Sequence, residues 1–166
     1  MANITLGGNP AETVGNLPEV GTKAPSFTLT NTDLADISLS DYSGSRLVLN
    51  IFPSVDTGVC AQSIRTFNEK ASNLDNTKVL CISKDLPFAM ARFCGAEGLD
   101  NVINLSDYKT GDFGNAYGVT FNNSAFETLL SRSVVVIDTD GTIIHTEQVK
   151  ETGEEPNYEA ALQALN

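Results

Sequence analysis

Residues 46–52, RLVLNIF, form an apolar run that ends at Pro53. Such a run is typical of a β-strand whose two faces are both buried. The apolar positions that follow repeat with the period of a helix, and they are Cys60, Ile64, Phe67, Ala71 and Leu74. The sequence therefore predicts a buried strand and then an amphipathic helix over residues 58–74. Asp56 or Thr57 is expected to cap that helix.

The alternation of strand and helix continues along the chain. Residues 77–83, TKVLCIS, predict a second buried strand, and Pro87 opens a short helix that Gly95 closes. A loop is expected through residues 102–105, and a short helix around residues 113–118. The last segments predict a β-hairpin and a closing helix, at residues 133–138, 142–149 and 157–165.

This order of elements constrains the fold class. Strand–helix–strand units imply parallel strands joined by right-handed crossovers. Two strand pairs precede them, and both are expected to add to the edge of the sheet: residues 3–6 with 11–14, and residues 26–30 with 36–39. We therefore expect an α/β, thioredoxin-like fold with an N-terminal β-hairpin extension and an insertion before the C-terminal hairpin. A single domain of residues 1–166 is expected.

Charge and cysteine usage exclude several classes of function. The net charge is −11 and the pI is about 4.3, which disfavours nucleic acid and anionic membrane surfaces as partners. The first ten residues have no basic or long apolar region, so we expect no signal peptide and a cytoplasmic location. Three cysteines are too few for a secreted disulfide framework, and they indicate a reducing compartment.

One of these cysteines, Cys60, is placed at the start of the first helix by the loop PSVDTGVC. A helix N-terminus stabilises a thiolate, but it usually supplies only about 0.3–1 kcal/mol. A cation is therefore expected to help, and Arg132 is favoured because it stands at the start of the central strand SVVVID. Thr57 occupies the position of the first thiol in a C-x-x-C motif, which weakens the interpretation as a dithiol reductase.

The loop resembles the peroxiredoxin active-site motif, Pro-x-x-x-Thr-x-x-Cys, at Pro53, Thr57 and Cys60. Neighbouring runs, including VLCISKDLPFAMARFCGAEGL, resemble the bacterial thiol peroxidase branch of that family. The resemblance implies that Cys60 is the peroxidatic cysteine and that Thr57 bonds to its sulfur and the peroxide. It further implies that Arg132 holds the thiolate and polarises the O–O bond, and that Pro53 shields the sulfenic acid from water.

The same resemblance implies how the sulfenic acid is resolved. Cys94 matches the arrangement of an intrachain Cys60–Cys94 disulfide, whereas Cys81, within a buried strand, is expected to be inert. Other peroxiredoxin branches carry the second thiol where Arg65 stands, or in a C-terminal tail that here has no cysteine. Both helical ends are expected to unwind, because a disulfide needs Cα atoms within about 7 Å. The family also implies thioredoxin as the reductant, a homodimer, and an apolar pocket for alkyl hydroperoxides.

Motifs for other kinds of functional site are weak or absent, and two alternatives to a peroxidase stay open. The cysteine spacing and a single histidine, His145, give no metal signature, and no cofactor motif is present. One alternative is a thiol–disulfide oxidoreductase that acts on proteins. The other is a noncatalytic, thioredoxin-like binding module. Phe and Leu side chains in residues 120–130 fit a substrate pocket, a dimer contact or plain core packing.

Overall fold

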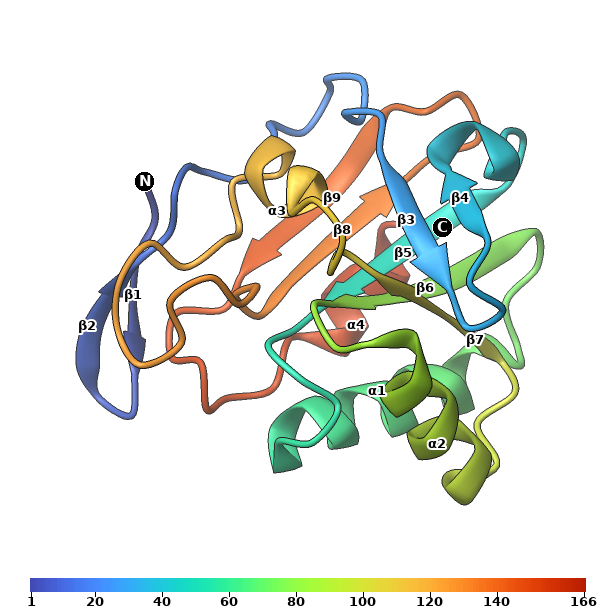
Figure 1. Cartoon of the computed structure of the whole chain (residues 1–166). Coiled ribbons are helices and arrows are strands. Elements are labelled where there is room, and N and C mark those ends of the chain that lie inside the picture. The colour runs from blue at the N-terminus through green and yellow to red at the C-terminus, as the bar shows by residue number, and fades with distance from the viewer.

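A computed structural model describes residues 1–166 and has a seven-stranded mixed sheet at its centre (Figure 1). The strand order is β4-β3-β7-β6-β5-β8-β9. From edge to edge the strands are β4 (Asp36–Ser38), β3 (Thr28–Asn31), β7 (Val102–Ser106), β6 (Thr77–Ser83), β5 (Arg46–Ile51), β8 (Ser133–Ile137) and β9 (Ile143–Gln148). β5, β6 and β7 are parallel, and the other pairings are antiparallel. The thioredoxin-like α/β fold is therefore confirmed.

Both faces of the sheet are covered, which explains the uninterrupted apolar runs. One face carries α1 (Gly58–Ala71), α2 (Pro87–Glu97) and α4 (Tyr158–Gln163), which pack against alternate side chains of the central strands. The other face is covered by α3 (Asp112–Ala116), by the short 3-10 helix η1 (Leu39–Tyr42) and by loops. In Figure 1, α1 and α2 lie side by side below the sheet.

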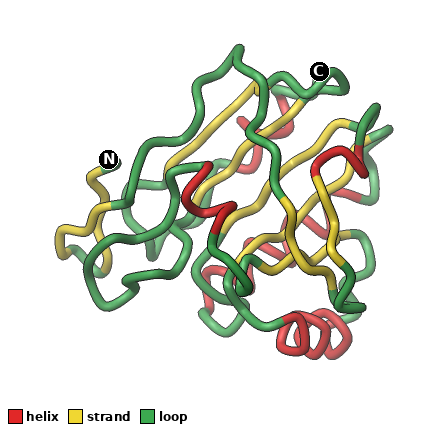
Figure 2. The backbone as a smooth tube through the Cα atoms, turned by 45° about the horizontal axis from the view of Figure 1, so that its top comes forward, coloured by secondary structure: helices red, strands yellow, loops and turns green.

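The N-terminal extension is a hairpin of β1 (Asn3–Leu6) and β2 (Asn9–Glu12). Its two-residue turn is Gly7-Gly8, with φ of 58° and 81°, a backbone conformation that glycine adopts without strain. The hairpin forms a sheet of its own, so the expectation that it adds to the edge of the main sheet is wrong. It stands apart at one end of the molecule, as the tube in Figure 2 also shows.

Three further expectations are corrected. Residues 102–105 belong to strand β7, which pairs with β6 and β3, and are not a loop. The helix α2 runs through Gly95 to Glu97, because Gly98 takes the left-handed conformation, φ 67°, that ends it. Cys94 therefore lies within α2. The first helix ends at Ala71 and not at residue 74. No helix is long and apolar enough to cross a membrane.

Candidate active site

Cys60 lies in the first turn of α1, after a partly buried loop that connects β5 to this helix. Its side chain is fully buried, and Pro53 is buried in the same loop. Asp85, which follows β6, anchors this loop: its carboxylate accepts hydrogen bonds from the Ser54 hydroxyl at 2.7 Å and the Val55 N–H at 2.8 Å. The anchoring role of Asp85 was not predicted from the sequence, because the only signal for it was a carboxylate placed after a buried strand.

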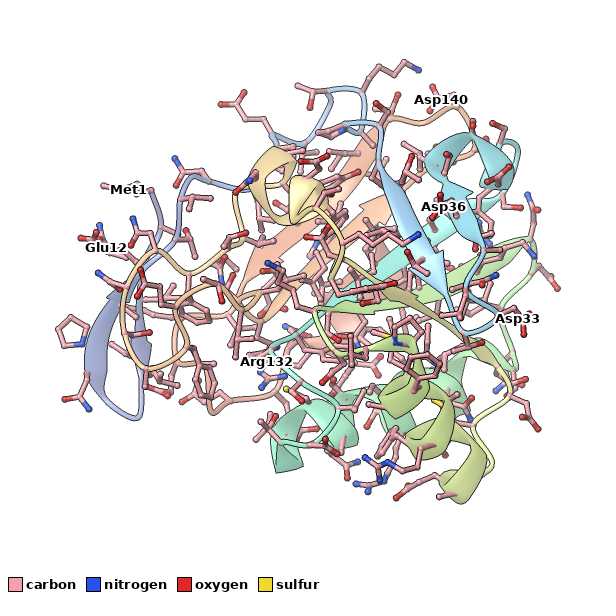
Figure 3. All side chains as sticks on the ribbon, viewed as in Figure 1. Met1, Glu12, Asp33, Asp36, Arg132 and Asp140 are labelled. Carbon is pink, nitrogen blue, oxygen red and sulfur yellow. The ribbon has the colours of Figure 1, made fainter.

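Arg132 faces Cys60 from the residue before β8. Its Nη2 donates to Cys60 Sγ at 3.3 Å, and its Nε donates to the Thr152 carbonyl at 3.0 Å. The side chain is only 2% exposed, and its Nη1 is buried with no hydrogen-bond partner. Figure 3 shows Arg132 at the N-terminal end of α1. The structure therefore brings together the two residues that the sequence linked, and it leaves one guanidinium nitrogen free to donate.

Thr57 occupies the N-cap position of α1, with extended backbone angles. We expected the side chain of Thr57 or Asp56 to cap the helix, and neither does. The Thr57 hydroxyl donates instead to the Ser54 carbonyl at 3.2 Å. Thr57 and Arg132 nevertheless line one small hollow of about 190 Å³. The hydroxyl oxygen keeps its capacity to accept a hydrogen bond at that hollow.

The walls of this hollow come from segments far apart in the sequence. Phe126 contributes from the loop before β8, and Leu6 and Gly7 contribute from the N-terminal hairpin. Glu151 fastens the hairpin there, since its carboxylate accepts bonds from the Thr5 hydroxyl and the Gly7, Gly8 and Gly153 N–H groups. These bonds, led by the one from Thr5, lower the pKa of Glu151 from 4.5 to about 2.

Comparison with known proteins shows which family this chain belongs to. Residues 19–162 match the family model described as Redoxin. The chain is 52% identical over 166 residues to "Thiol peroxidase" of Corynebacterium glutamicum, with all of both chains covered. It is 56% identical over 165 residues to "Thiol peroxidase" of Mycobacterium tuberculosis, with 99% of each chain covered.

The chain belongs to the redoxin family. A solved structure described as a peroxiredoxin-like protein from Aquifex aeolicus superposes with a TM-score of 0.93 at 33% identity, over 99% of this chain and 96% of that one. A thiol peroxidase from Chromobacterium violaceum superposes with a TM-score of 0.92 at 22% identity, over 99% and 96%, which bears on the fold alone. Full-length identity above one half to thiol peroxidases makes this redoxin a thiol-dependent peroxidase.

The second cysteine of interest in this redoxin, Cys94, lies on the inner side of α2 and is 8% exposed. The side-chain amide of Asn104 donates to its sulfur at 3.0 Å, a contact that sequence reasoning did not foresee. Burial raises the pKa of the Cys94 thiol, and the bond from Asn104 opposes that shift. Cys94 is thus held in the core and is unpaired, as are Cys60 and Cys81.

Cys81 is fully buried in β6, and burial raises its pKa to about 12. Such a thiol stays protonated at neutral pH, so the structure supports the prediction that it is inert. His145 is half-buried in β9. No group of three or more His, Cys, Asp or Glu side chains is placed to hold a metal ion.

Two ion pairs join the segment that carries Cys60 to the helix that carries Cys94. Arg65 of α1 makes a two-pronged pair with Glu97 of α2, at 2.5 and 2.8 Å. Arg92 of α2 pairs with Asp56 of the active-site loop at 3.0 Å. Both pairs are exposed to solvent. Both ion pairs therefore join the two segments whose relative position would change if Cys94 approached Cys60.

Proposed function

We propose that this enzyme reduces hydrogen peroxide and alkyl hydroperoxides through a sulfenic acid on Cys60, which Cys94 resolves as an intrachain disulfide. The observation that carries the proposal is the 3.3 Å contact between the buried sulfur of Cys60 and Arg132, a residue that also lines a small hollow together with Thr57. A merely structural cysteine has no need of a buried guanidinium, whose desolvation is costly.

In the first step the Cys60 thiolate attacks the terminal oxygen of the hydroperoxide. The S–O bond forms as the O–O bond breaks, sulfur is oxidised to sulfenic acid, and the leaving oxygen takes a proton to become water or an alcohol. The free Nη1 of Arg132 donates to the oxygen on which negative charge grows. The Thr57 hydroxyl oxygen accepts a hydrogen bond from the O–H of the hydroperoxide, and Pro53 keeps water from the sulfenic acid.

In the second step the Cys94 thiolate attacks the sulfur of the Cys60 sulfenic acid. The S–S bond forms and the S–O bond breaks, so hydroxide leaves and is protonated to water. Both sulfurs are buried on separate helices, so the start of α1 and the end of α2 must unwind. Faster amide exchange in residues 58–62 and 90–97 than in the strands is the expected sign of that motion.

Regeneration requires a dithiol, and the proposed donor is thioredoxin, which returns two electrons by attack on the disulfide. A homodimer is proposed on the family resemblance. Three unpaired cysteines suit a reducing compartment such as the cytoplasm. We also propose one domain over residues 1–166, because the hairpin is bonded to the segment after β9 through Thr5 and Thr152.

A single-turnover assay tests the proposal against the thiol–disulfide oxidoreductase. Reduced protein is mixed with one equivalent of hydrogen peroxide, without a reductant, and the remaining peroxide is measured. We expect the parent and Cys94→Ser to consume it and Cys60→Ser to leave it. Under turnover, Cys94→Ser should stall unless a small thiol is added. Reduction of insulin disulfides without peroxide consumption would favour the oxidoreductase and refute the proposal.

A further inference from the structure

The side chain of Asn104, in β7, points into the core toward α2. Asn104 is 8% exposed, and its one side-chain hydrogen bond runs from Nδ2 to the sulfur of Cys94 at 3.0 Å. Its Oδ1 is buried and has no partner. Native proteins pair nearly all buried polar atoms, so an amide that keeps an unpaired oxygen in order to reach one thiol calls for an explanation.

The unpaired oxygen alone does not distinguish Asn104, because Oδ1 of Asn50 is also buried without a partner. The sheet register aligns Asn104 with Cys81 of β6, and Cys81 with Asn50 of β5. Asn50 is a second buried amide in the same row, and it donates to the Ser63 hydroxyl at 3.2 Å and to Cys81 at 3.7 Å. Each amide therefore lies against a different thiol, and only the thiol beside Asn104 is used in the proposed reaction.

The chemistry of the contact has a definite direction. An N–H donor lowers the free energy of a thiolate more than that of a thiol, because the thiolate carries the negative charge. The other influences on Cys94 act the opposite way. Burial raises its pKa, and so do the carboxylates of Asp100 and of Glu97. Among these influences, only the hydrogen bond from Asn104 favours the thiolate, the form of Cys94 that can attack.

The contact also lies beside a route to solvent. Cys94 and Asn104 line a hollow of about 410 Å³ between α2 and the edge of the sheet, together with Asn31 and Leu99. A small reagent can therefore approach the sulfur from this side with little rearrangement. Gly95 lines the same hollow, so the Asn104 amide lies close to the end of α2 that has to unwind in the proposed reaction.

We propose that Asn104 is a positioning residue for the resolving step, which orients the Cys94 sulfur and favours its thiolate through the donated N–H bond. It acts through Cys94 and does not itself bond to Cys60. The inference rests on the proposed function, in which the Cys94 thiolate displaces hydroxide from the Cys60 sulfenic acid and forms the S–S bond.

Alkylation of Cys94 by iodoacetamide as a function of pH tests this in a Cys60→Ser, Cys81→Ser background. Because the reagent reaches the sulfur through the hollow, the midpoint reports the protonation of the Cys94 thiol in the folded protein, and the plateau reports the reactivity of its thiolate there. Asn104→Leu and the nearly isosteric Asn104→Asp should raise the midpoint by about one unit, so that the rate at neutral pH falls about tenfold. Asn50→Leu, a matched loss of a buried amide, should leave the midpoint unchanged.

The proposal is overturned if the Asn104 variants keep the parental midpoint, or if Asn50→Leu shifts it equally. A second measurement uses the protein with all three cysteines. After one equivalent of peroxide, trapping of the sulfenic acid by dimedone should be as fast in Asn104→Asp as in the parent, whereas disulfide formation should be about tenfold slower. If the parent itself forms no disulfide, the proposed function fails, while the Cys94 titration still decides the role of Asn104.

Discussion

Replacing Arg132 by methionine removes the guanidinium that faces Cys60 while keeping an unbranched side chain in the core. Arg132 donates one bond to the sulfur, and its buried Nη1 is free to donate a second to the peroxide. A hydrogen bond to a charged group contributes about 1.5–3 kcal/mol, and two of them contribute about 3–6 kcal/mol. At about 1.36 kcal/mol per factor of ten, their loss slows the reaction by about 10²- to 10⁴-fold.

The assay is stopped-flow consumption of peroxide in a Cys94→Ser background, where only the first chemical step is observed. Arg132→Lys keeps the positive charge but has no planar fork, so we expect its rate to lie between those of Arg132→Met and the parent. Loss of the bond to the Thr152 carbonyl affects the fold as well as the chemistry. The thermal unfolding midpoint of each variant therefore has to be measured.

A matched control is available at Arg46, which donates to the backbone carbonyls of Asp75 and Leu165 and lies outside the hollow that Arg132 and Thr57 line. Arg46→Met also loses arginine–carbonyl bonds, but its rate with peroxide should equal that of the parent. If Arg132→Met reacts within about threefold of the parent, the two-bond estimate is wrong and Arg132 is a structural residue.

Three further predictions concern the surroundings of the site. Cys81→Ser should leave peroxide consumption unchanged, and native Cys81 should resist alkylation at pH 8, because its thiol is buried with a pKa raised to about 12. Because its pKa is lowered, the ionised form of Glu151 stabilises the hairpin above about pH 4.5, and this stabilisation is lost as the pH falls toward 2. The NMR amide signals of Gly7 and Gly8 should therefore shift between these two pH values. In Glu151→Gln the pH dependence should vanish; an unchanged profile would mean that another group holds the hairpin. Arg65→Ala should speed amide exchange at the end of α2 by no more than about fivefold, because its pair with Glu97 is exposed, and 1 M salt should do the same to the parent.

The strands and helices next to the site were predictable because local patterns define them. The apolar runs of β5, β6 and β8 need burial on both faces, and the sheet supplies it. The pairing of Arg132 with Cys60 followed from topology. Ile51 at the end of β5 is in register with Ser133 at the start of β8, which puts Arg132 next to the loop that leaves β5.

Other parts depend on contacts that no local pattern records. Residues 102–106 are a strand because β6 and β3 provide partners, although the run is short and Asn104 interrupts it. The segment Gly95-Ala96-Glu97-Gly98 offers two glycines that can end α2, and only the backbone conformation selects the second. The hydrogen bonds that Glu151 accepts from Thr5, Gly7 and Gly8 join segments more than 140 residues apart. The sequence therefore could not show that the hairpin lines the hollow next to Arg132.

In the proposed reaction the sulfur of Cys60, beside Arg132, takes an oxygen atom from peroxide and then forms a disulfide with Cys94. The most direct measurement is the intact mass of the reduced protein after one equivalent of hydrogen peroxide, followed by peptide mapping without reduction. We expect the loss of two hydrogens and a crosslinked pair of peptides that contain Cys60 and Cys94. An unchanged mass with the peroxide still present, or oxygen found on Cys81 or on a methionine, would contradict it.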